Sequence, residues 1–148
     1  MKGIHHIIVS NGNLKYEFDI KRNITILKGD SATGKTTLIE MIQEYLIDGP
    51  DSGVNFSCDT ECRVLTGNLW KEQISNNQDA ILFIDEGNRF IESQEFAEMV
   101  KKSGNYYVIV TRENLEVLPI SVDEIYGIKS SGKYGSLEPV YHEFYKIC

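Results

Sequence analysis

Long apolar runs are absent from this chain of 148 residues. A membrane-spanning helix requires ~20 consecutive apolar residues, and no segment approaches that length. The beginning of the chain, from Met1 to His6, also lacks the long apolar stretch and the cleavage site that are typical of a signal peptide. We therefore expect a cytoplasmic protein that makes no contact with a membrane.

Cysteine is scarce, and its odd number argues against a disulfide framework, since the cysteines are Cys58, Cys62 and Cys148. Cys58 and Cys62 are close enough in sequence to form a metal site or a redox pair. No second Cys/His pair lies nearby to complete a four-ligand metal site, and His142 is distant. We favour the interpretation that these are reduced thiols of a cytosolic protein.

Positive charge is also in short supply, because the net charge is −7 and no basic run stands out. A domain that binds nucleic acid by bulk electrostatics requires clustered Lys and Arg. We therefore expect no autonomous nucleic-acid binding. The composition of 41% hydrophobic and 25% charged residues is typical of a soluble globular protein, and the length suits one domain.

Residues 29–36 match the phosphate-binding loop pattern G-x-x-x-x-G-K-[ST] at every position. Gly29 and Gly34 allow backbone torsions that a Cβ would forbid, so that consecutive N–H groups can point into one concavity. Lys35 supplies a charge for the outer phosphates, and the Thr36 hydroxyl is a ligand for Mg²⁺. The residues that we expect to bind the nucleotide are Gly29, Asp30, Ser31, Ala32, Thr33, Gly34, Lys35, Thr36 and Thr37.

The surroundings of this loop decide whether the pattern is meaningful. Residues 24–27 are apolar and β-branched, which predicts a buried strand before the loop. Residues 35–47 carry apolar side chains at helical spacing, and Asp48-Gly49-Pro50 then supplies a helix stop. Strand, loop and helix in this order are the context that the pattern requires.

The remainder of the chain alternates between short apolar runs and amphipathic segments. We expect an N-terminal antiparallel hairpin from residues 4–9 and 14–20. Further strands are expected at 63–65, 80–84, 106–110, 124–128 and 138–147, and further helices at 68–76 and 93–104. This alternation predicts an α/β fold with a mainly parallel sheet and helices on both faces. Ligands of such sheets bind at the carboxyl ends of the strands.

Asp85 and Glu86 directly follow the predicted strand at 80–84, which places both carboxylates at a strand's carboxyl end. Asp85 there can complete the Mg²⁺ site that Thr36 begins. Glu86 can orient or deprotonate a water molecule that attacks the γ-phosphate.

With these two motifs the chain resembles the P-loop NTPases of the ASCE type, which carry a glutamate after the Walker B aspartate. It is similar to a minimal ABC- or AAA-like ATPase core over residues 22–128. The resemblance implies a three-layer fold in which the sensor strand (106–111) lies between the Walker A strand (24–28) and the Walker B strand (81–85). From the length and the sequence pattern we expect one domain over residues 1–148, with the hairpin at 1–21, the nucleotide-binding core at 22–128 and a C-terminal loop and strand at 129–148.

Several features of the related families are missing. Residues 47–80 contain no LSGGQ-like signature of ABC-type ATPases, and the chain has no room for the helical lid of AAA-type ATPases. The GTPase motif N-K-x-D does not occur, and D-x-x-G is not matched at Asp85. We therefore expect ATP rather than GTP, together with Mg²⁺.

The end of the predicted strand at 106–110 supplies two more candidates. By resemblance, Thr111 is the residue that senses the γ-phosphate. Arg112 is either a charge stabiliser for the transferred phosphate or a surface partner of Glu113 or Glu116, and the sequence favours neither.

Residues 130–136 form a Ser- and Gly-rich segment with one cation, Lys133. We interpret this segment as a loop that connects the final strands. If it folds over the site instead, Lys133 is the residue that contacts phosphate or a partner.

Three functions remain open on the sequence alone. The first is a Mg²⁺-dependent ATPase, with Lys35, Glu86, Thr111 and Arg112 as catalytic candidates, which acts as a switch coupled to a protein partner or a second copy of itself. The second is a small-molecule kinase, against which the absence of an Arg-rich lid counts. The third is a non-catalytic adaptor whose nucleotide state recruits a partner.

Overall fold

The structure is a computed structural model, and it describes residues 3–12, 15–21, 23–28, 35–85, 88–111, 124–131 and 134–139. At residues 28, 35–37, 111, 124–131 and 134–139 the structure describes the backbone alone.

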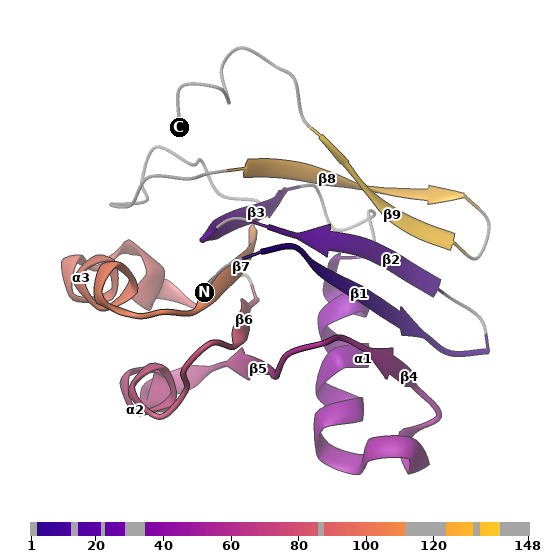
Figure 1. Cartoon of the computed structure of the whole chain (residues 1–148), viewed down its shortest axis with the longest axis horizontal. Coiled ribbons are helices and arrows are strands. Elements are labelled where there is room, and N and C mark those ends of the chain that lie inside the picture. The colour runs from indigo at the N-terminus through magenta and orange to yellow at the C-terminus, as the bar shows by residue number, and fades with distance from the viewer. Residues whose placement is uncertain are drawn as a thin grey trace.

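Strands and helices alternate along most of the chain (Figure 1). The strands are β1 (His5–Ser10), β2 (Lys15–Ile20), β3 (Ile24–Lys28), β4 (Asn55–Ser57), β5 (Cys62–Leu65), β6 (Ile81–Ile84), β7 (Tyr106–Thr111), β8 (Glu124–Ser131) and β9 (Tyr134–Pro139). The α-helices are α1 (Lys35–Asp48), α2 (Trp70–Ser75) and α3 (Gln94–Lys102). Short 3₁₀ turns are η2 (Gly49–Ser52), η3 (Gly67–Leu69) and η4 (Arg89–Glu92).

Within the described residues, the strands follow the order β4-β1-β2-β9-β8-β3-β7-β6-β5. The five strands from β8 to β5 are each parallel to their neighbours in this order. The predicted position of β7 between β3 and β6 is confirmed, and β8 and β5 lie on the two flanks of these three strands. The predicted N-terminal hairpin is also confirmed, since β1 pairs antiparallel with β2.

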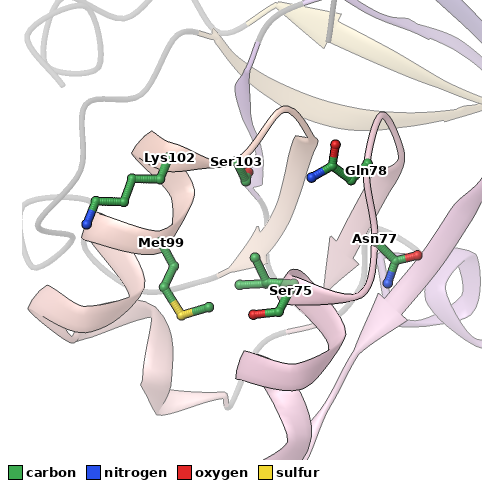
Figure 2. A pocket seen from close by; sticks show the side chains of 7 residues that line it. Ser75, Asn77, Gln78, Met99, Lys102 and Ser103 are labelled. Atoms are coloured by element: carbon green, nitrogen blue, oxygen red, sulfur yellow. The ribbon is translucent and has the colours of Figure 1, made fainter.

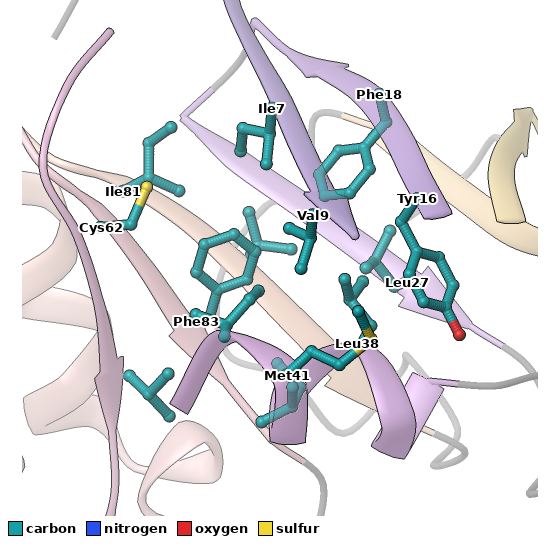
Figure 3. Packing of buried hydrophobic residues seen from close by; sticks show 14 of the residues in the cluster. Ile7, Val9, Tyr16, Phe18, Leu27, Leu38, Met41, Cys62, Ile81 and Phe83 are labelled. Carbon is teal, nitrogen blue, oxygen red and sulfur yellow. The ribbon is translucent and has the colours of Figure 1, made fainter. Parts of the chain in front are cut away.

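Two hydrophobic clusters cover the two faces of the parallel strands. One cluster unites α1, the β1–β2 hairpin and one face of the strands; in Figure 3, Leu38 and Met41 of α1 lie near Val9 and Leu27. The other cluster holds α2 and α3 against the opposite face, through Trp70 and Phe96 among others. Helices therefore lie on both faces, as the alternating pattern predicts.

The helix boundaries follow local signals in the sequence. Helix α1 ends at Asp48, and Gly49 then adopts a φ of 61°, a left-handed conformation that costs glycine least. Ser93 caps α3, because its hydroxyl oxygen accepts a hydrogen bond from the Phe96 backbone N–H at 3.1 Å. Both boundaries agree with the sequence-based prediction to within about two residues.

Three details differ from prediction. Strand β4, which pairs antiparallel with β1, is missing from the prediction because it has only three residues and a weak pattern. The last strand was expected at 138–147, but β9 occupies Tyr134–Pro139, and residues 140–148 lie outside the described part of the chain. The segment 130–136, predicted as a loop that connects the final strands, does connect them but is shorter than predicted: residues 130–131 end β8 and residues 134–136 begin β9, and these two strands pair antiparallel.

Candidate functional site

The carboxyl ends of three parallel strands meet at one edge of the sheet. Lys28, the last residue of β3, is paired with Thr111, the last residue of β7. Ile84, the last residue of β6, is paired with Ile109 of β7. The carboxyl ends of β3, β7 and β6 therefore lie side by side at this edge.

Helix α1 begins at this edge of the sheet. The chain leaves β3 at Lys28 and begins α1 at Lys35, so residues 29–34 connect a strand end to a helix start, but they lie outside the described residues. The α1 backbone places Lys35, Thr36 and Thr37 in the first helical turn. Buried residues in the next turns, such as Leu38, anchor the helix to the sheet face.

Asp85 follows β6, whose residues Ile81–Ile84 are all buried. Its side chain is half-buried at the carboxyl edge of the sheet. The Asn88 side-chain amide donates a hydrogen bond of 2.8 Å to the Asp85 backbone carbonyl, which fixes the chain as it leaves the strand. The structure thus holds a carboxylate at the place that the sequence predicts.

The predicted site residues divide into two groups. The backbone positions of Lys35, Thr36, Thr37 and Thr111, together with Asp85, come to one edge of the sheet. The others lie outside the described residues; they are Gly29, Asp30, Ser31, Ala32, Thr33, Gly34, Glu86 and Arg112. The same holds for Lys133.

The residues at this edge have the chemistry that a magnesium–nucleotide complex requires. Threonine and aspartate, the residue types at positions 36 and 85, carry oxygen atoms, which are the ligands that Mg²⁺ prefers. The first turn of α1 also presents backbone N–H groups and the positive end of the helix dipole, both of which favour an anion. The donor set therefore fits Mg²⁺ and phosphate together.

A separate pocket of about 220 Å³ lies at the opposite edge of the sheet (Figure 2). It lies beside the segments that lead into β6 and β7, next to the ends of α2 and α3, so it is far along the strands from Asp85. Its lining consists of Ile74, Ser75, Asn77, Gln78, Met99, Lys102 and Ser103. Because ligand pockets usually measure roughly 300–1,000 Å³, this one is small, and no signal in the sequence predicts it.

Cys58 and Cys62 lie away from the carboxyl edge, directly after β4 and at the start of β5. Among the described residues, no group of three or more His, Cys, Asp or Glu side chains can hold a metal ion. Both cysteines are free thiols.

Within the residues that the structure describes, no helix combines the length and the apolar character that crossing a membrane requires.

Comparison with known proteins adds little to this geometry. No protein-family model matches the chain, and no curated protein sequence matches it either. Among solved structures, a chain from a model of ribosome-bound archaeal Pelota and ABCE1 is similar, with a TM-score of 0.48 and 12% identity. The match covers 90% of this chain but 33% of that chain, so this protein spans about a third of its length.

Proposed function

We propose that this protein binds ATP and hydrolyses it to ADP and phosphate in the cytoplasm, as a Mg²⁺-dependent switch coupled to a partner. The observation that carries the proposal is the strand order, in which β7 lies between β3 and β6. This order brings the start of α1, the end of β7 and Asp85 to one edge. A phosphate-loop sequence occupies the connection at this edge.

Phosphate binding is the task of the segment between β3 and α1. The loop N–H groups and the Lys35 ammonium compensate the charge of the β- and γ-phosphates. The Thr36 hydroxyl and the Asp85 carboxylate are the residues that hold Mg²⁺, which supplies charge compensation to the phosphates when bound.

Water activation is the task of Glu86, which follows the metal-binding aspartate. A carboxylate next to Asp85 can accept a proton from the attacking water or orient it in line with the bond that breaks. Thr111 is the last residue of β7, the strand that lies between β3 and β6 in the sheet. From this position a hydroxyl can contact the γ-phosphate. Arg112, the next residue, is the candidate for stabilising charge in the transition state.

The test uses the two aspartates that border the same strand. Asp85 lies after the carboxyl end of β6, whereas Asp79 lies before its amino end, next to Ala80. We expect Asp85→Asn to lose Mg²⁺-dependent phosphate release and Asp79→Asn to retain it. Asn suits the position of Asp79, whose φ is 54°, because Asn tolerates the left-handed conformation.

Two measurements distinguish the outcomes of this test. Phosphate release is followed with and without Mg²⁺, and binding of a fluorescent ATP analogue is followed in the same samples. Equal phosphate release by the two variants would remove Asp85 from the mechanism. Binding without any release would point to the adaptor function, and release of ADP only when an acceptor molecule is added would point to a kinase.

A further inference from the structure

The turn at residues 58–62 connects two parts of the sheet that differ in strand direction. It follows β4, which pairs antiparallel with β1, and leads into β5, which pairs parallel with β6. Each end of the turn carries a cysteine, Cys58 and Cys62. The turn therefore brings two thiols to a junction between the β1–β2–β4 part and the parallel part.

The two thiols differ in exposure but lie against the same hydrophobic cluster. Cys62 is 3% exposed and belongs to the cluster around α1, where Figure 3 shows it beside Ile81. Cys58 is half-buried and packs against that cluster from outside. The two side chains thus reach one cluster from the two ends of a short turn, which holds their thiols close together before any reaction.

Hydrogen bonds hold the intervening residues in this shape. The His5 ring and the Asp59 carboxylate are 2.6 Å apart, and the Thr60 hydroxyl donates to the Asp79 carbonyl at 2.6 Å. Each thiol also has a weak acceptor inside the turn, 3.8 Å away: Asp59 for Cys58, and the Thr60 carbonyl for Cys62. The turn is thus fixed to β1 and to the start of β6, and the thiol pair does not depend on a mobile loop.

Exposure and mutual influence make the two thiols unequal as nucleophiles. The neighbouring Cys62 thiol lowers the pKa of Cys58 to about 7. The neighbouring Cys58 thiol, followed by burial, raises the pKa of Cys62 above its ordinary value. Because the thiolate is the reactive form, Cys58 is the nucleophile that reacts first, and Cys62 is the thiol that reacts second.

We propose that Cys58 and Cys62 form a reactive dithiol that a hydroperoxide converts to an intramolecular disulfide. A half-exposed thiol with a buried thiol beside it, at the other end of one fixed turn, is the arrangement of a peroxidatic and a resolving cysteine. The reaction is separate from the nucleotide chemistry, because the turn lies beside β4 and the amino end of β5 rather than at the carboxyl edge.

The reaction consumes one hydroperoxide and two thiols. The Cys58 thiolate attacks one peroxide oxygen, the O–O bond breaks, and the leaving oxygen takes up a proton, which gives a sulfenic acid on Cys58 and one molecule of water or alcohol. The Cys62 sulfur then attacks the Cys58 sulfur, the S–O bond breaks, and the hydroxyl group leaves as water with the Cys62 proton. Both sulfur atoms are oxidised, and both peroxide oxygens are reduced.

Peptide mapping of the full-length protein tests the proposal directly. The protein is treated with hydrogen peroxide, its remaining thiols are alkylated under denaturing conditions, and the chain is cleaved after glutamate. Glu61 separates the two cysteines, so cleavage there leaves two peptides that only a disulfide can hold together. We expect this linked pair, lighter by two hydrogens than its parts, and its separation by dithiothreitol.

Variants distinguish the two roles and remove the third thiol. In a Cys148→Ser background the linked pair should persist, whereas Cys62→Ala should stop at a sulfenic acid on Cys58 that a dimedone probe captures. Cys58→Ser should leave Cys62 unoxidised, because that thiol is buried. Iodoacetamide should label Cys58 with a midpoint near its pKa of about 7, well below that of an ordinary thiol.

Three results with the wild-type protein would overturn the proposal. One is recovery of both cysteines as alkylated thiols after peroxide treatment. The second is a disulfide that links either residue to Cys148 instead. The third is co-purified Zn²⁺ that protects both thiols from alkylation until a chelator removes it.

Discussion

The two edges of the parallel sheet both carry polar residues, but these residues differ in what they bind or are expected to bind. At the amino edge, the Asn105 side chain accepts a hydrogen bond of 3.0 Å from the Ala80 N–H and donates one of 3.1 Å to the Asn77 carbonyl. Nearby, the hydroxyl groups of Tyr107 and Ser103 are 2.7 Å apart. At the carboxyl edge, the strand ends lead into Asp85 and into the phosphate-loop segment.

The contrast separates residues that hold the fold together from residues that we assign to a ligand. Asn105 is buried, and its amide satisfies backbone groups that would otherwise be unpaired at the strand starts. Substitutions at the amino edge should therefore change the free energy of unfolding and leave turnover of the folded protein intact. Substitutions at the carboxyl edge should do the opposite.

The largest expected effect is at the carboxyl edge, in the variant Glu86→Gln. Loss of a general base lowers turnover by roughly 10²–10⁴-fold, whereas the glutamine keeps the size of the side chain. We expect ATP affinity and melting temperature to be close to those of the wild type. Single-turnover phosphate release measures the effect, and Glu98→Gln on the exposed face of α3 is the matched control. Unchanged turnover would remove Glu86 from the mechanism.

A smaller effect is expected at the amino edge, in Asn105→Ala. The substitution leaves the Ala80 N–H and the Asn77 carbonyl without their side-chain partner, which should cost about 1–3 kcal/mol in the free energy of unfolding. Urea denaturation measures this cost, and Asn76→Ala, at an exposed position, is the control. A loss of ATP turnover in the folded variant would contradict the separation between the two edges.

The smallest effect is expected at the start of α3, in Ser93→Ala. Removing the cap leaves the Phe96 N–H without its acceptor and should lower stability by about 1 kcal/mol. Ser75→Ala, at an exposed residue in the last turn of α2, should change stability much less. Equal midpoints of urea denaturation in the two variants would show that the hydrogen bond from the Phe96 N–H to Ser93 adds nothing.

The sequence predicts the parallel strands well because their signals are local and strong. Residues 81–84 are a continuous apolar run, which indicates a strand buried on both faces, and β6 is such a strand. Ser93 and Gly49 mark helix ends through capping and left-handed backbone, which act within a few residues. For the candidate site, the order of motifs placed Asp85 at a strand's carboxyl end, as the structure has it.

The features that the sequence does not predict depend on contacts between distant segments. Strand β4 has only three residues and exists as a partner of β1, more than 40 positions away in the chain. Strand β9 pairs with β2, and neither strand's own pattern specifies that neighbour. The placement of Cys58 and Cys62 at the two ends of one turn depends on hydrogen bonds to His5 and Asp79, and spacing alone does not reveal such partners.

The most direct test of the central claim is Mg²⁺-ATP hydrolysis by the wild type, Lys35→Ala and Lys102→Ala. Lys35 begins α1 at the carboxyl edge, whereas Lys102 lines the pocket at the amino edge. The account predicts phosphate release by the wild type and by Lys102→Ala, and none above background by Lys35→Ala. Equal rates in all three proteins, whether measurable or at background, would contradict an ATPase that works at the carboxyl edge.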